Sequence, residues 1–178
     1  TNVISAFAED VAGNVGLPVV FTLLYVDPVH DSFAEASELT SLTSTVTAMT
    51  EFATREPGEP FHAGNEGGHS VWYWFRAPAP GTLDLTPQGS TFDTLLAVYT
   101  GDAVSALTLV GSNDDANPGS GYSDVTVAGQ RGQVYRVAGD GFGGEYGVGS
   151  LRHTFTTVET YYSLTLIAGL GGAIDPAG

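Results

Sequence analysis

Apolar and polar residues alternate with a period of two along most of this chain, in short segments separated by glycine and proline. This alternation places successive side chains on opposite faces of a strand and is typical of half-buried β-strands. The segments are rich in Val, Thr, Leu and Tyr, and the 24 Gly and 9 Pro mark turns between them. The pattern predicts strands in the middle of the chain at 44–49, 70–76, 81–86, 95–100, 107–112, 123–127, 134–139 and 147–155.

These strands predict an all-β fold, an antiparallel two-sheet sandwich of the jelly-roll type centred on residues 30–155. Helical spacing occurs only at 31–39, where Asp31 is a candidate N-cap for a turn or two of helix. The residues that period 2 directs into the core are Val71, Tyr73, Leu96, Val98, Val125 and Val137.

Residues 1–28 form a separate zone with two strand-like pieces, 2–8 and 17–26, joined by a turn-prone loop at 10–14. They predict an N-terminal β-hairpin or donor-like strand segment, which must pack on the main domain or pair with another chain because a lone hairpin is marginal in water. The apolar run 17–26 is too short to cross a bilayer, so no membrane insertion is expected. The start at Thr1 has no signal-peptide pattern, and we expect a piece of a longer, processed protein.

Composition limits the function. The chain has 20 acidic residues against 5 Lys and Arg, and its net charge of −15 disfavours nucleic acid as a partner. The absence of cysteine excludes disulfides, thiol catalysis and zinc-thiolate sites. The sequence contains no His-Glu-x-x-His motif, Gly-x-Ser-x-Gly elbow or phosphate-binding loop, so we expect no enzymatic activity.

Several stretches of the middle zone carry a family resemblance: FAEASEL at 33–39, EPGEPFHAGNEGG at 56–68, SVWY at 70–73, APAPG at 77–81, STFDTLLAVYTG at 90–101, LTLVGSNDD at 107–115 and DGF at 140–142. In this order they resemble the bacterial pre-peptidase C-terminal (PPC) domain, a β-sandwich of secreted proteases and large surface proteins. The resemblance implies a module of a secreted or cell-surface protein. The usual Asn-Asp opening of that family is replaced here by His30-Asp31-Ser32, which removes one oxygen ligand.

The two flanks carry resemblances of their own. Residues 1–28 resemble the last strands of bacterial immunoglobulin-like repeats, through Ala8, Asp10, Ala12, Gly13, Asn14, Val15 and Tyr25. Residues 159–178 resemble the start of an internalin-type B repeat, with Leu-Thr-Leu at 164–166 and Gly-Gly at 171–172. The expected division is therefore 1–28, the PPC-like sandwich at 29–158, and the tail at 159–178.

The first candidate site is a Ca²⁺ site at Asp31, Glu56 and Glu59. Ca²⁺ takes six to eight oxygen ligands, and Glu-Pro-Gly-Glu-Pro holds two carboxylates three residues apart on a proline-stiffened loop. The resemblance implies the same ion, since related collagenase domains hold Ca²⁺ with acids at similar spacing. Alternatively, Glu56 and Glu59 pair with Arg55 or Arg76, or accept hydrogen bonds from loop amides.

A second acidic group consists of Asp93, Asp114 and Asp115, together with Asn113 and Asp124. Oxygen-bearing side chains in one loop suit a hard cation such as Ca²⁺. Asx side chains also accept hydrogen bonds from the amides of their own turns, which is the other interpretation of this group.

The aromatic segment Val71 to Phe75 places Trp72 and Trp74 on the face opposite Tyr73. An exposed Trp stacks well on a sugar ring, so both Trp are candidate ligand-binding residues. Trp74 packed under the N-terminal hairpin is the competing interpretation.

Three functions follow as hypotheses. The first is a non-catalytic, calcium-stabilised structural or binding module whose partners are neighbouring modules. The second is a carbohydrate-binding module of a polysaccharide-degrading enzyme. The third is a subunit of an extracellular fibre, in which 2–26 adds as strands to an identical subunit.

Overall fold

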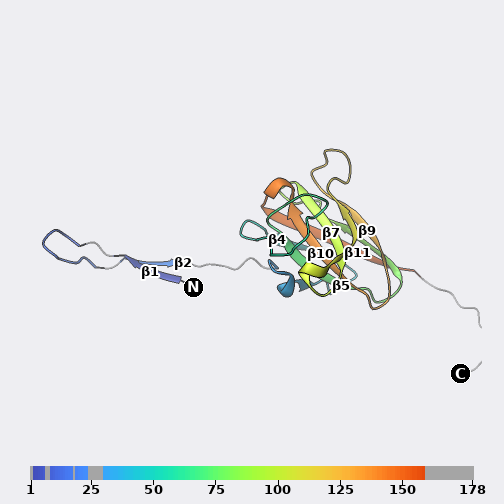
Figure 1. The fold of residues 1–178 in the computed structure, drawn as a ribbon, viewed down its shortest axis with the longest axis horizontal. Helices are drawn as coiled ribbons and strands as arrows, with labels where there is room; N and C mark the ends of the chain where they lie inside the picture. The colour runs from blue at the N-terminus through green and yellow to red at the C-terminus, as the bar shows by residue number, and fades with distance from the viewer. Residues whose placement is uncertain (1, 7–8, 18, 24–29, 159–178) are drawn as a thin grey trace, which may run out of the picture.

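The computed structural model describes residues 2–6, 9–17, 19–23 and 30–158, and two antiparallel-dominated sheets form a β-sandwich from residue 37 onward (Figure 1). The five-stranded sheet has the order β3-β5-β10-β7-β8, and the four-stranded sheet has the order β4-β11-β6-β9. The predicted fold class is confirmed. The five-stranded sheet consists of β3 (Ser37–Glu38), β5 (Val71–Arg76), β10 (Val134–Gly141), β7 (Thr94–Thr100) and β8 (Thr108–Asn113). The four-stranded sheet consists of β4 (Thr43–Met49), β11 (Val148–Thr157), β6 (Gly81–Thr86) and β9 (Val125–Gly129).

The main core lies between the two sheets and follows the period-2 pattern. In β9, for example, Val125, Val127 and Gly129 are buried while Thr126 and Ala128 face solvent. All six residues predicted for the core are buried there, so this prediction is confirmed.

A second apolar layer covers the outer face of the five-stranded sheet. The strand β7 is buried along Thr94–Tyr99 without alternation, as expected for a strand enclosed on both faces. The second apolar layer consists of Phe33, Trp72, Ala97, Tyr99 and Ala138, with Ala36, Val104 and Leu107 packed against them. We name this cluster the outer layer. The loops that carry Phe33 and Val104 form its cover.

The helix expected at 31–39 is only a single 3-10 turn, η1 (Phe33–Glu35), and Asp31 does not cap it. The N-cap is Ser32, which makes no capping hydrogen bond, and Ser37–Glu38 pairs in parallel with β5 instead. Periodicity over nine residues did not reveal this strand because only two residues pair. Two further 3-10 turns, η2 (Val104–Ala106) and η3 (Phe142–Gly144), lie in loops.

The predicted N-terminal hairpin is present: β1 (Asn2–Ala6) pairs antiparallel with β2 (Val19–Leu23). At its tip, the Asp10 carboxylate accepts hydrogen bonds from the Ala12 and Asn14 amides. Among the described residues, these two strands pair with each other and with no strand of the sandwich. The tail at 159–178 lies outside the described residues, and so does the B-repeat prediction. No described helix is long and apolar enough to cross a membrane.

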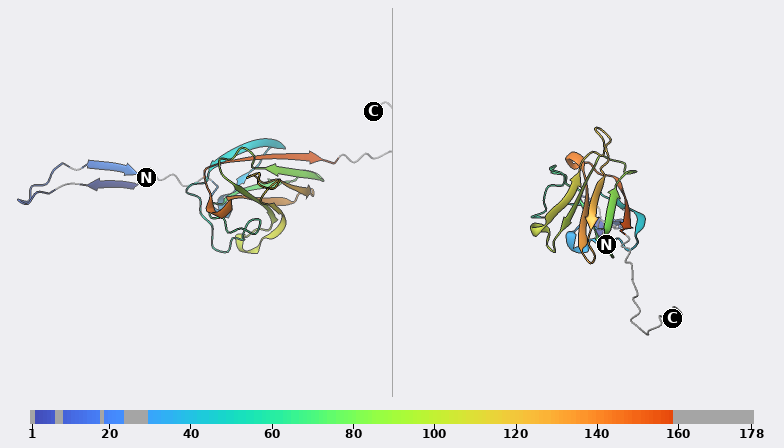
Figure 2. Two further views of the ribbon diagram at one scale, coloured as in Figure 1. Left: turned by 90° about the horizontal axis from the view of Figure 1, so that it is seen from above. Right: turned by 90° about the vertical axis from the view of Figure 1, so that its right-hand side faces the viewer.

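The sandwich receives and releases the chain at opposite ends (Figure 2). The His30 backbone carbonyl accepts a hydrogen bond from the Trp72 amide at the start of β5. The Val158 amide donates a hydrogen bond to the Pro80 carbonyl just before β6. We call these the N-terminal end and the C-terminal end of the sandwich. Because β5, β7 and β11 begin at the N-terminal end, the loops 50–70, 87–93, 114–124 and 142–147 all gather there.

Leu96→Ala should lower the free energy of unfolding by about 2 to 5 kcal/mol, because it leaves a cavity between two packed sheets. Leu96 is fully buried. Leu109→Ala on the exposed side of β8 is the matched control and should change the free energy by less than about 0.5 kcal/mol. Urea denaturation measures both, and equal effects would show that Leu96 does not lie in the core.

Candidate functional site

All six carboxylates predicted as metal ligands lie in loops at the N-terminal end. Asp31 precedes η1, Glu56 and Glu59 lie in the segment 54–60, and Asp93 precedes β7. Asp114 and Asp115 follow β8. We name the segment 54–60 the Glu-Pro loop and the segment 64–68 the glycine loop.

A buried polar network lies beneath the Glu-Pro loop. His62 Nε2 is 2.8 Å from Glu59 Oε1, and His62 Nδ1 is 2.8 Å from the Tyr99 hydroxyl. All three residues are at most 3% exposed, and the His62 ring meets Trp72 edge-on at 5.5 Å between centroids. The second Glu59 oxygen accepts a hydrogen bond from the Glu56 amide at 2.8 Å. The network therefore holds the Glu-Pro loop against the outer layer.

The network changes the pKa values of Glu59 and Tyr99. Burial alone would raise the pKa of Glu59, but hydrogen bonds from His62, Ser70 and the Glu56 amide together outweigh it and lower the pKa. Burial and the nearby Glu59 carboxylate raise the pKa of Tyr99 above its ordinary range. Glu59 is thus a carboxylate and Tyr99 a neutral phenol at neutral pH.

Asp31 and Glu56 join η1 to the Glu-Pro loop. Asp31 Oδ1 accepts a hydrogen bond from the Thr54 amide at 2.6 Å, and Glu56 Oε2 accepts one from the Phe33 amide at 2.6 Å. Each bond links residues 23 positions apart. The interpretation in which these acids bind loop amides describes the contacts in the structure.

The structure does not assemble Asp31, Glu56 and Glu59 into a ready metal site. Each has at least one oxygen engaged by a backbone amide, and Glu59 is directed into the buried network. Within the described ranges, no three His, Asp or Glu side chains converge closely enough to hold a metal ion.

The second acidic group, around Asp93, has more of the properties expected of a cation site than the group of Asp31, Glu56 and Glu59. Burial, followed by the charges of Asp115 and Glu145, raises the pKa of Asp93. Burial and the charges of Asp93 and Asp115 raise the pKa of Asp114. Asp93 Oδ1 is buried and, in the described part of the chain, makes no hydrogen bond. Asp115, in contrast, has its pKa lowered by the amides of Gly119 and Gly121, the turn role expected of an Asx residue.

The two tryptophans occupy different environments. Trp72 is fully buried in the outer layer, and its indole N–H has no partner among the described residues. It therefore presents no surface for sugar stacking, and this part of the prediction is wrong because the loops cover its face of the sheet. Trp74 is partly exposed on the same face, in register with Glu38 on one side and Arg136 on the other.

Asp140 at the end of β10 was not among the predicted site residues. It is buried, and its carboxylate accepts hydrogen bonds from the amides of Gly68 and His69 at 2.9 to 3.1 Å. A Cβ at Gly67 would collide with this carboxylate, and Gly67 has a φ of 57°. Glycine is therefore required here, and Asp140 holds the glycine loop as Glu59 holds the Glu-Pro loop.

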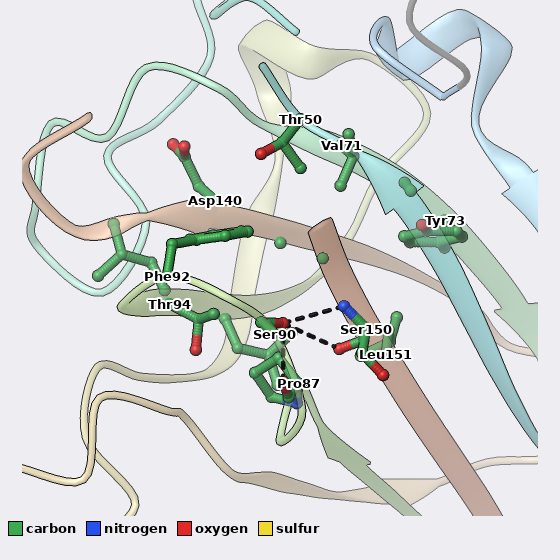
Figure 3. A pocket seen from close by; sticks show the side chains of 15 residues that line it. Thr50, Val71, Tyr73, Pro87, Ser90, Phe92, Thr94, Asp140, Ser150 and Leu151 are labelled. Atoms are coloured by element: carbon green, nitrogen blue, oxygen red, sulfur yellow. Dashed lines mark hydrogen bonds between the residues drawn. The ribbon is translucent and has the colours of Figure 1, made fainter. Parts of the chain in front are cut away.

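Two cavities differ in what they can accommodate. A hollow of about 470 Å³ lies between the two loops and is lined by Arg55, Glu56, Pro57, Gly58, Glu66, Gly67 and Gly68. A second cavity lies between the sheets under Phe92, with Ser90 bonded to the backbone of Ser150 at its edge (Figure 3). Its volume of about 30 Å³ is enough only for water. The hollow between the loops is thus much larger than the cavity between the sheets.

Comparison with known proteins gives matches only among solved structures. No family model and no curated protein matches the chain. The chain is similar to the pre-peptidase C-terminal domain of a collagenase from Bacillus anthracis, at 12% identity and a TM-score of 0.43 over 68% of this chain and 95% of that one. It is also similar to PliG, a periplasmic inhibitor of g-type lysozyme from Aeromonas hydrophila, at 16% identity and a TM-score of 0.45 over 68% and 96%. The first is of the class that the sequence resembles, and both similarities concern fold alone.

Glu59→Gln should reduce stability at neutral pH by about 1 to 3 kcal/mol, because it removes the charge from a buried network of hydrogen bonds. A lowered folded-state pKa contributes stability that is present above the unfolded pKa and is lost as pH falls through the folded value. The variant should therefore lose less stability than the parent as pH falls below about 4.5.

Urea denaturation from pH 7 to pH 3 measures this difference. Glu51→Gln, at an exposed position, is the control and should follow the parent within about 0.5 kcal/mol at neutral pH. Parallel pH profiles for the parent and Glu59→Gln would contradict the assignment of Glu59 as a buried carboxylate.

Proposed function

We propose that residues 30–158 are a non-catalytic structural module that spaces or attaches other domains of a secreted or cell-surface protein. The observation that carries this proposal is the placement of His30 and Val158 at opposite ends of the sandwich. A module with this geometry adds its full length to a chain of domains. Neighbouring modules of the same polypeptide are its partners in this proposal, and identical subunits joined by strand addition are the alternative.

The environment of the ionisable side chains supports a non-catalytic role. Glu59 and His62 resemble an acid–base pair, but both are buried and bonded within the protein. A catalytic base must reach a proton on its substrate. The geometry of this pair instead supports a role in holding a loop.

The resemblance to modules of secreted proteases and surface proteins supports a location outside the cell. The net charge of −15 suits salty surroundings, in which an acidic surface keeps a protein soluble.

Calcium stabilisation is part of this proposal, and the acidic group around Asp93 supports it best. Asp93 has a buried oxygen without a partner among the described residues, and burial, followed by the charges of neighbouring carboxylates, raises its pKa. A divalent cation would relieve that repulsion. Asp114 would be the second carboxylate, and the two side chains would have to draw together around the ion, because the described acids do not already converge on one point.

Carbohydrate binding is the second candidate function, and the surroundings of Trp74 favour it. Its indole is partly exposed, and its strand neighbours Glu38 and Arg136 offer an acceptor and a donor. These are groups that bind sugar hydroxyls next to a stacking surface.

Two copies of the chain fused in tandem should form an extended particle. Small-angle X-ray scattering should give a maximum dimension close to twice that of one copy, because each sandwich passes the chain from one end to the other. A second fusion with a long Gly-Ser linker is the control for flexibility. A maximum dimension close to that of one copy would show that modules pack side by side and would contradict the spacing role.

Millimolar CaCl₂ should raise the melting temperature by several degrees above that in NaCl of equal ionic strength, since a ligand that binds only the folded state stabilises it. Asp93→Asn with Asp114→Asn should remove the Ca²⁺-specific increase. Glu56→Gln should retain it. Equal shifts in the two salts would show that the acids act only as surface charge.

A further inference from the structure

We propose that two copies of the chain associate through β4, the free edge of the four-stranded sheet, and that the two β4 strands pair antiparallel. The two four-stranded sheets then become one continuous sheet. This inference goes beyond the spacing role and does not depend on it. It is distinct from addition of the N-terminal hairpin to a neighbour, because both copies contribute the same strand.

The two sheets have four edge strands, and in the described part of the chain β4 is the only long one that stays open. β3 pairs over two residues. β8 and β9 contact each other, so closely that a Cβ at Gly111 would lie 3.2 Å from Val125 and from Val127. β4, in contrast, is seven residues long, lies at the margin of its sheet and pairs with β11 alone (Figure 2).

Half of the backbone groups of β4 point away from β11. At the two ends of the ladder, the Phe155 amide donates to the Leu42 carbonyl and the Thr50 amide donates to the Gly147 carbonyl. Because bonded pairs alternate along an antiparallel ladder, the even-numbered residues 44–48 bond to β11 and the odd-numbered residues 43–49 face outward. The described residues offer these outward groups one partner, the Ser41 hydroxyl on the Thr43 carbonyl at 3.2 Å.

β4 has none of the features that usually protect an edge strand from pairing. Such strands are kept short, bulged, or occupied by proline or charged residues. The sequence of β4 is Thr-Ser-Thr-Val-Thr-Ala-Met, without proline or charge. Its register with β11 is continuous over seven pairs, whereas β8 is interrupted by an irregularity. β4 therefore has the regular geometry that a further strand needs.

Charge favours contact between copies at this edge. The net charge of −15 makes two copies repel each other over much of their surface. β4 is uncharged, and the β11 residue opposite Thr45 is Arg152, which is exposed and forms no ion pair with a described residue. The edge is thus a neutral strip beside a positive charge, where the approach of a second acidic copy costs least.

The strand is also its own complement. A two-fold axis at Val46 places Thr45 opposite Thr47 of the second copy and Thr43 opposite Met49, so all seven residues pair. In this register each outward amide faces an outward carbonyl, and Thr–Thr pairs across strands are favourable. Val46 is half-buried at the edge of the core and meets its counterpart at the axis. This match identifies a second copy as the partner.

The test combines sedimentation velocity with hydrogen exchange of the full chain from micromolar concentration to about 1 mM, since an interface of two strands is small. The chain should pass reversibly from monomer to dimer, and the amides of Thr45, Thr47 and Met49 should gain protection as it does. The amides of Val46 and Ala48 bond to β11 and should be protected throughout. A monomer at every concentration, or protection gained on another strand instead, would overturn the proposal.

Charged variants test the register. Thr45→Lys with Thr47→Lys places like charges opposite each other and should raise the dissociation constant at least about tenfold, and Thr45→Glu with Thr47→Glu should do the same. An equimolar mixture of the two variants should dimerise again, because each new lysine then lies opposite a new glutamate. Thr126→Lys with Thr156→Lys, at exposed positions of the same sheet, is the matched control and should dimerise at least as well as the parent.

Three results would contradict pairing through β4. These are a dimer that the paired Lys variant leaves intact, a mixture of Lys and Glu variants that stays monomeric, and a dimer that is lost in Ile4→Pro with Phe21→Pro. The last result would identify the N-terminal hairpin as the donor strand. All of these experiments use single copies, so their failure leaves the spacing role untouched.

Discussion

The fold depends on one constraint: the central strands of the five-stranded sheet are apolar on both faces. The inner face is covered by the second sheet, but in the part of the chain that the structure describes no further sheet covers the outer face around Trp72 and Tyr99. Loops must do this instead, and a loop over an apolar surface needs partners for its own polar groups. The Glu59, His62 and Tyr99 network meets that need beneath the Glu-Pro loop, so the shape of the N-terminal end follows from the composition of β7.

Several acidic side chains also provide hydrogen-bond partners for the backbone of these loops. Asp31, Glu56, Glu59 and Asp140 each accept hydrogen bonds from backbone amides that would otherwise lack partners. Amide donors stabilise a carboxylate without a counter-charge. This explains how a chain with so few basic residues keeps its loops ordered. Asp93 and Asp114 have little of this compensation, and burial together with the charges of neighbouring carboxylates raises the pKa of both.

Period 2 was sufficient to predict the sandwich, its strands and the six core residues, because alternation depends only on which face is buried. It did not reveal Ser37–Glu38, which pairs over two residues, or the fate of Trp72, whose face is covered by loops distant in sequence. The acids at 31, 56 and 59 were found, but the same residue types suit amide hydrogen bonds and metal ligation, and only tertiary contacts distinguish them. The hollow was missed, although the glycines at 64, 67 and 68 beside Glu-Pro-Gly-Glu-Pro gave a signal for uncovered backbone.

The opposite placement of the two ends has a mechanical consequence. A force that pulls the chain apart along its length acts parallel to β11, the strand that leads out of the sandwich. β11 is bonded over seven residue pairs to β4 and over six to β6. Such a force loads these hydrogen bonds in shear, all together, whereas a force across the strand would open them one after another. The sandwich is therefore oriented to bear tension between whatever it joins.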